Sequence, residues 1–191
     1  YYLQDNRPEK ELLAISADRD NHIHILSDKG VLVPDNGSLF YPGKLISDQA
    51  YQPMLSKQIK AIETYDNQTV YLDNKQILSN AWAGKIQIEH GLPGALIFAA
   101  GKDFQFLVSD GNQMVYLNHS GEKLWTGTFA GLKEIKYQTA GDRFVLVCET
   151  KVAVFNASAN TLKTIFEGTG ITCAEPLEKS DTIAIGTSER Y

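Results

Sequence analysis

Short apolar runs separated by polar turn residues extend along the whole chain. The runs are rich in Val, Ile, Phe, Tyr and Leu, which are the residues that pleated sheets favour. No segment sustains the three-to-four-residue apolar spacing of an amphipathic helix. The pattern therefore predicts many short strands and an all-β fold.

A strand–turn–strand unit recurs at intervals of about 40 residues, which is the period of a four-stranded propeller blade. The turns of these units are Ser27–Gly30, Asp73–Lys75, Ser109–Asn112, Glu149–Thr150 and Gly186–Glu189. Two of the strands that lead into these turns are expected at Phe104–Val108 and Asp181–Ile185. A β-sandwich would also contain short strands and frequent turns, but it has no reason to repeat at this interval.

Two further sets of segments recur at the same interval of about 40 residues. The expected innermost strands are Leu13–Ser16, Ile59–Ile62, Ala95–Phe98, Glu134–Tyr137 and Ile171–Ala174. The expected outer strands are Gly43–Ile46, Gly84–Ile86, Glu122–Trp125 and Leu162–Ile165. We therefore predict a β-propeller with four-stranded blades of about 40 residues. Residues 1–191 would form a single propeller domain or a partial propeller, with four full blades and a terminal partial blade. The fifth blade would either close a five-bladed ring or belong to a larger propeller from which this chain is an excerpt.

Two segments resemble known propeller families. Asp181–Thr187 resembles the repeat core of two-component-regulator propellers, the extracytoplasmic sensor regions of bacterial hybrid signalling proteins, although Ala184 stands where an aromatic residue is usual. Asn112–Trp125 resembles a quinoprotein-type blade. The resemblance implies propeller architecture and an extracytoplasmic sensor or surface protein, in the periplasm or outside the cell. Only one blade carries the quinoprotein tryptophan, so we expect no cofactor.

Composition narrows the classes of function. The 191 residues are 43% hydrophobic and 21% charged, which is too apolar for a disordered chain. The formal net charge of -5 makes nonspecific nucleic-acid binding a poor fit. No run approaches the roughly 18 apolar residues that a membrane-spanning helix needs, so this segment is not expected to insert into a bilayer.

Metal-ligand patterns are sparse. His22 and His24 would share one face of a strand, but a zinc or copper site needs further ligands. Asp18–Asn21 offers oxygen ligands without the glycine and glutamate of a calcium loop. We therefore predict no metal site. Cys148 and Cys173 lie in apolar runs and are expected to be buried thiols.

Carboxylates recur in the predicted turns. They are Asp28, Asp73, Asp110, Glu149 and Glu189. On one rim of a ring they would form a negative collar, and paired carboxylates are what glycoside hydrolysis requires. Aspartate is also favoured in turns for structural reasons alone. No nucleophile motif or phosphate-binding glycine loop is present, so we expect no catalytic residues.

The favoured hypothesis is a noncatalytic binding module, because blades form a rigid scaffold and their loops vary freely. The partner would be a protein, a small carbohydrate-like ligand or the rest of a larger chain. The candidate ligand-binding residues are Asp28, Asp73, His90, Asp110 and Phe129. One alternative is a glycosidase or lyase that uses the carboxylate collar. Another is a structural assembly module that a different chain or segment completes.

Overall fold

A computed structural model describes residues 12–17, 23–27, 30–33, 44–45, 60–65, 68–81, 84–177 and 180–188. The chain forms two compact units, residues 1–89 and residues 90–191. Among the described residues, no helix has the length and apolarity needed to cross a bilayer.

The first unit contains two four-stranded antiparallel sheets, each with its strands in sequence order. The strands of one sheet are β1 (Leu12–Ala17), β2 (Ile23–Ser27), β3 (Gly30–Val33) and β4 (Lys44–Leu45). The strands of the other are β5 (Ala61–Tyr65), β6 (Gln68–Leu72), β7 (Gln76–Ala81) and β8 (Gly84–Glu89).

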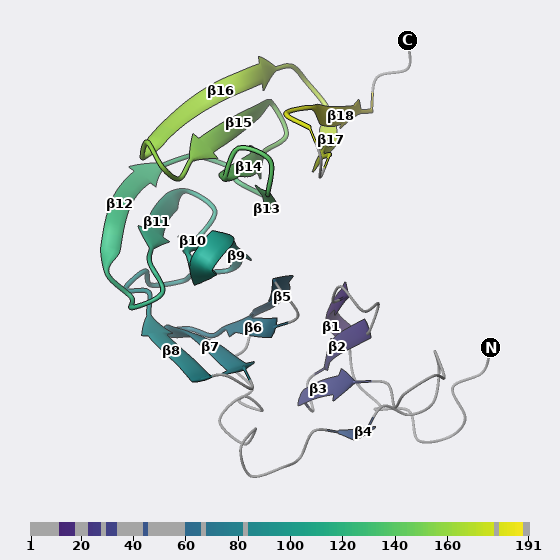
Figure 1. Ribbon diagram of the computed structural model, residues 1–191. Helices are drawn as coiled ribbons and strands as arrows, with labels where there is room; N and C mark the ends of the chain where they lie inside the picture. The colour runs from purple at the N-terminus through teal and green to yellow at the C-terminus, as the bar shows by residue number, and fades with distance from the viewer. Residues whose placement is uncertain are drawn as a thin grey trace, which may run out of the picture. The chain divides into compact units, whose positions relative to one another are not determined.

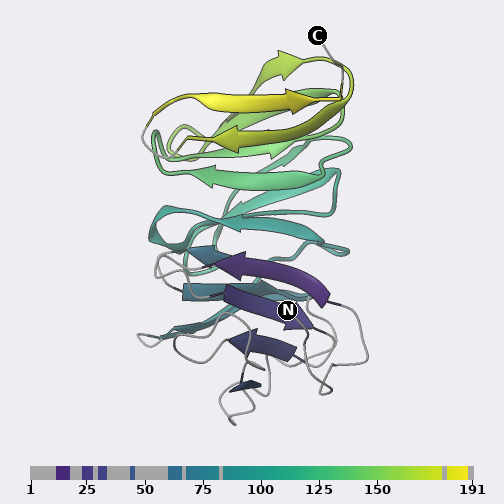
Figure 2. The same cartoon turned by 90° about the vertical axis from the view of Figure 1, so that its right-hand side faces the viewer.

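The second unit repeats this arrangement (Figure 1). Its first sheet contains β9 (Ile97–Ala100), β10 (Phe106–Ser109), β11 (Gln113–Leu117) and β12 (Lys123–Thr128). Its second sheet contains β13 (Glu134–Gln138), β14 (Arg143–Val147), β15 (Lys151–Asn156) and β16 (Thr161–Glu167). The antiparallel pair β17 (Ile171–Pro176) and β18 (Ile183–Thr187) follows, and Figure 2 shows it in yellow.

Burial explains the apolar runs in the sequence. Every residue of β10 is buried, and so are the last four residues of β11 and of β14. The second and third strands of a sheet are covered on both faces, so their sequences are continuously apolar rather than alternating. The fourth strands β12 and β16 lie at an edge and are largely exposed, which matches their mixed polar sequences.

Aromatic side chains join the first two sheets of the second unit. Phe155 of β15 packs against Trp125 of β12 with ring centroids 4.6 Å apart, and against Tyr116 of β11 at 5.0 Å. The first strands lie together, because β13 has both β9 and β17 beside it. A second apolar cluster, which includes Val147, Val152 and Ile185, packs the β17–β18 pair against the second sheet. Within the second unit, each sheet therefore buries apolar side chains against the next sheet in sequence.

The predicted all-β fold with four-stranded repeats is confirmed. Some predicted elements have different limits in the structure: the innermost strand expected at Ala95–Phe98, for example, is β9 at Ile97–Ala100. Phe104 was expected in a strand, but Asp103 and Phe104 have φ of 56° and 54°, and their turn delays β10 until Phe106. The expected turn at Gly186 is part of β18, because Gly186 pairs with Cys173.

Candidate functional site

One end of the second unit gathers two kinds of loop, which we call the rim. It consists of residues 90–96, 109–112, 129–133, 148–150 and 168–170. Hairpin turns bond to the connections between sheets: Phe129 N donates to Asn112 O at 2.7 Å, and Leu132 N donates to Gly111 O at 2.8 Å. The next hairpin repeats the pattern, since Gly168 N donates to Thr150 O at 3.0 Å. Backbone hydrogen bonds thus fix the loops of the rim to one another.

Asp110 holds one of these hairpins. Its Oδ1 accepts hydrogen bonds from Asn112 N at 2.8 Å and from Gln113 N at 2.7 Å. The preceding Ser109 is fully buried, and its Oγ accepts from Gly111 N at 3.0 Å while donating to Gln113 O at 2.8 Å. These are the local side-chain bonds by which aspartate and serine stabilise turns.

Asp73 has the same role in the first unit. Its Oδ1 accepts from Lys75 N and Gln76 N, both at 2.7 Å, and its side chain is buried. For these two predicted collar carboxylates, the structure thus shows the turn-capping role that aspartate has in many hairpins. Asp28 lies outside the described residues, so its role stays a prediction.

His90 and Phe129 belong to the rim but are buried. His90 is 1% exposed, and its Nδ1 accepts from Leu92 N at 3.1 Å. Phe129 is 3% exposed and packs in the core, with the ammonium of Lys151 4.4 Å from its ring centroid. The rim therefore brings together three predicted site residues, His90, Asp110 and Phe129, and two of them face the interior.

The candidate metal ligands do not come together in the described part of the chain. No group of three His, Cys, Asp or Glu side chains suited to a metal ion occurs there. His119 is exposed in the β11–β12 turn, while His22 and Asp18–Asn21 lie outside the described residues. Cys148 is a buried free thiol, as expected, but Cys173 is exposed, since it lies opposite the apolar cluster on β17.

The surface of the rim combines one apolar side chain with charged ones. Leu96 precedes β9 and is 54% exposed, while its backbone N–H bonds Ser109 O at 2.9 Å. Lys133 occupies the equivalent position before β13 and pairs with Glu149 at 3.2 Å, with both side chains more than half exposed. Leu96 is thus an exposed apolar side chain on a hydrogen-bonded backbone, and its neighbours on the rim include charged side chains.

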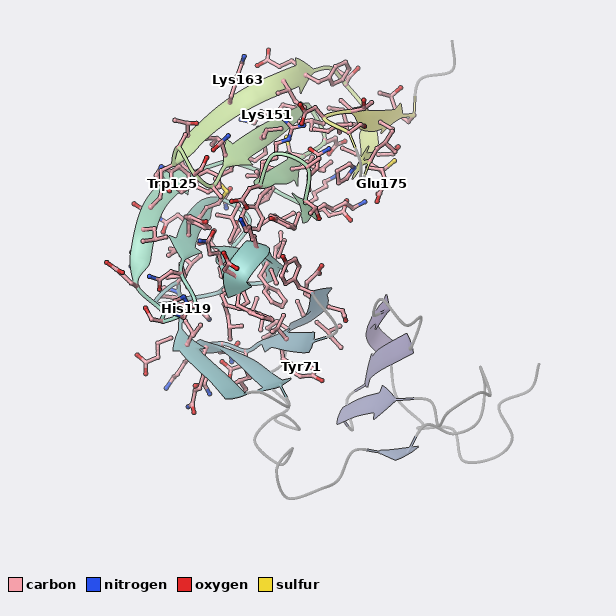
Figure 3. The ribbon with its side chains drawn as sticks, viewed as in Figure 1. Tyr71, His119, Trp125, Lys151, Lys163 and Glu175 are labelled. Atoms are coloured by element: carbon pink, nitrogen blue, oxygen red, sulfur yellow. The ribbon has the colours of Figure 1, made fainter. Side chains whose placement is uncertain are left out.

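A charged cluster on the innermost strands was not predicted from the sequence. Lys136 of β13 forms ion pairs with Glu134, at 3.4 Å, and with Glu175 of β17, which Figure 3 labels. Partial burial opposes the charge of Lys136, but the hydrogen bond to Glu175 and the nearby Glu134 outweigh it and raise the pKa of the ammonium. A lysine held in its charged form is a poor general base or nucleophile.

A buried polar network, at the end of the sheets opposite the rim, was also not predicted from the sequence. Gln138 is 1% exposed, and its Nε2 donates to Ser180 O at 2.8 Å and to Thr182 O at 3.2 Å. Arg143 Nε donates to Gln138 Oε1 at 2.6 Å, and its guanidinium pairs with Asp181 at 3.3 Å. This network fastens the β17–β18 pair to the preceding sheet, and a glutamine in a strand gives no sequence signal of such a role.

A third polar group lies between the first two sheets of this unit. Tyr116 hydroxyl donates to Gln105, and Tyr137 hydroxyl donates to Asp142 at 2.9 Å. Burial, with a smaller contribution from the Asp142 charge, raises the pKa of Tyr116 to about 12. The phenol is therefore a structural hydrogen-bond donor rather than an acid–base group.

No protein-family model matches the sequence, and no curated protein matches it. Solved structures do match. Virginiamycin B lyase from Staphylococcus aureus is 15% identical with a TM-score of 0.60, over 96% of this chain and 65% of that one. The extracellular domain of a hybrid two-component system from B. thetaiotaomicron is 12% identical with a TM-score of 0.60, over 93% of this chain and 27% of that one. A chain of the mitotic checkpoint complex is 12% identical with a TM-score of 0.68, over 97% of this chain and 60% of that one.

This chain thus spans less than two thirds of the length of each of these three structures. At such identities the likeness concerns the fold and not the activity. The matched proteins are β-propellers, and their blades are four-stranded antiparallel sheets like those described above. The chain is accordingly a β-propeller repeat protein.

Proposed function

We propose that the chain is a noncatalytic binding module whose rim, in the second unit, recognises a protein partner. The observation that carries the proposal is the 54% exposure of Leu96 on a loop whose backbone is bonded to a neighbouring hairpin. Because the backbone at Leu96 is already hydrogen-bonded, a partner that covers this side chain would not have to order the loop, which lowers the entropic cost of binding. Exposed polar groups around such a contact come from Lys133, Glu149 and Asn112.

Three further observations support a binding role. Asp73 and Asp110 use their carboxylate oxygens to cap turns. Lys136 is held in its charged form. One propeller of the same fold comes from the mitotic checkpoint complex, an assembly of proteins.

The proposal keeps the expected extracytoplasmic location and the expected sensor role. A carbohydrate-like ligand, a glycosidase or lyase activity and an assembly module stay alternatives.

Replacing Leu96 with Asp is expected to weaken partner binding at least about tenfold, as loss of a hot-spot side chain does. The charge would have to be desolvated beneath the partner, while the backbone bond to Ser109 is kept. Proteins retained by the immobilised wild-type chain would be identified by mass spectrometry, and the affinity of the purified partner would then be measured by calorimetry.

The matched control is Leu124→Asp, because Leu124 is 39% exposed on the outer strand β12, away from the rim loops. This variant should retain the partner with unchanged affinity. If Leu96→Asp binds as tightly as the wild type, or if both variants lose the partner equally, the rim is not the binding surface.

A further inference from the structure

The β10–β11 hairpin contains the sequence Asp110–Gly111, the only Asp-Gly pair in the chain. The turn itself demands both residues. Gly111 has φ of +98°, a conformation that residues with a Cβ rarely adopt. Asp110 supplies the Oδ1 atom that caps the backbone of Asn112 and Gln113. The geometry of the rim therefore places an unhindered backbone nitrogen directly after an aspartate side chain.

Such a pair has a known intramolecular chemistry. The nitrogen of the second residue attacks Cγ of the aspartate carboxyl in its protonated form and a C–N bond forms. The C–OH bond of the carboxyl then breaks, and the hydroxyl leaves with the amide proton as water. Water then opens the five-membered succinimide at one of its two carbonyls. Opening at Cγ restores aspartate, whereas opening at the former backbone carbonyl gives isoaspartate, in which the main chain runs through Cβ and Cγ. The product is an isomer of the starting chain, so only water is needed.

Three hydrogen bonds in this hairpin oppose the first step. The attacking nitrogen of Gly111 donates its proton to Ser109 Oγ at 3.0 Å. The carboxylate of Asp110 is held by two other N–H groups through Oδ1, at 2.8 and 2.7 Å. Ser109 cannot turn away freely, because its side chain is fully buried and its hydroxyl donates to Gln113 O at 2.8 Å. Asp110 and Gly111 are nonetheless partly exposed, so water reaches them.

We propose that Asp110–Gly111 is an isoaspartate-forming site of the rim, and that the buried hydroxyl of Ser109 is the group that keeps it unreacted in the folded chain. Isomerisation would insert one extra carbon into the backbone and remove the side-chain cap. The carbonyls of Gly111 and Asn112, which accept from Leu132 and Phe129, would then be displaced. The modification would thus loosen the connection between two sheets at the rim.

The test incubates the chain at 37 °C and neutral pH and measures isoaspartate at residue 110 by methyltransferase labelling and by electron-transfer mass spectrometry of the peptide. Folded wild-type chain should accumulate it slowly, and the same chain in denaturant several-fold faster. Folded Ser109→Ala should accumulate it several-fold faster than the wild type, whereas Ser109→Thr, which keeps a hydroxyl, should resemble the wild type. Asp110→Glu should give no product at this position, because its longer side chain would require a larger ring.

Two results would overturn the proposal: equal rates for folded wild type and folded Ser109→Ala, or equal rates for wild type with and without denaturant. The second comparison needs no variant, so it holds even if Ser109→Ala does not fold. The effect of isomerisation on partner binding rests on the proposed function, but the isoaspartate measurement does not. A chain that shows the expected rates and no rim binding would refute only the proposed function.

Discussion

Replacing Phe155 with Ala is expected to lower the free energy of unfolding by about 3–5 kcal/mol, the usual cost of deleting a fully buried aromatic side chain. Phe155 has no exposed surface and lies at the centre of the cluster between two sheets. Its ring meets those of Trp125, Tyr116 and Phe144 at centroid distances of 4.6, 5.0 and 6.3 Å. Alanine would leave a cavity that the paired strands cannot close.

The measurement is equilibrium unfolding in urea, followed by tryptophan fluorescence and circular dichroism. Phe166→Ala is the matched control, because Phe166 lies on the outer strand β16 of the same sheet and is 38% exposed. Phe166→Ala should lower the free energy of unfolding by less than about 1 kcal/mol. Similar losses for the two variants would mean that the interface between the sheets does not hold the unit together.

Adding a single methyl group at Gly101 is expected to destabilise the second unit by about 1–3 kcal/mol, which is typical of overpacking. A Cβ at this position would lie 2.7 Å from Phe144 Cζ and 2.9 Å from Tyr137 Cε2. Both rings belong to the next sheet and are packed against each other at 5.2 Å, so they have little room to withdraw. Gly101→Ala should therefore reduce the urea midpoint with no large change in the slope of the transition.

Gly168→Ala provides the control for this substitution. Its Cβ would lie 3.0 Å from Phe166 Cε1, but that ring is partly exposed and can move into solvent. The change in stability should be smaller than about 1 kcal/mol. If the two alanine variants have the same stability, the close approach of the sheets at Gly101 is not a determinant of the fold.

The repeating fold was predictable because each blade encodes the same local sequence of strand and turn. Glu134–Tyr137 and Leu162–Ile165, for example, fall within β13 and β16. Strand burial on two faces leaves an unbroken apolar run, and the tight turns between them require Asp, Asn or Gly. Where the prediction was wrong, backbone geometry was the reason: at Phe104 a turn with positive φ replaces the start of a strand.

The candidate surface was only partly predictable. Asp110 and His90 belong to the rim as a loop pattern suggests, but sequence does not show that His90 and Phe129 are buried. Leu96 was expected within the innermost strand Ala95–Phe98, but β9 begins at Ile97 and the leucine side chain is exposed. The ion pair between Lys136 and Glu175 joins residues from separate repeats, and its existence depends on how neighbouring sheets align.

Amide hydrogen exchange of the chain, free and with its purified partner, tests the rim as a binding surface most directly. The partner is expected to slow exchange in residues 91–96, 110–112 and 130–133, where hydrogen bonds link the loops, and to leave exchange in the outer strands β12 and β16 unchanged. Protection centred on β12 or β16, with unaltered exchange in those loops, would contradict it.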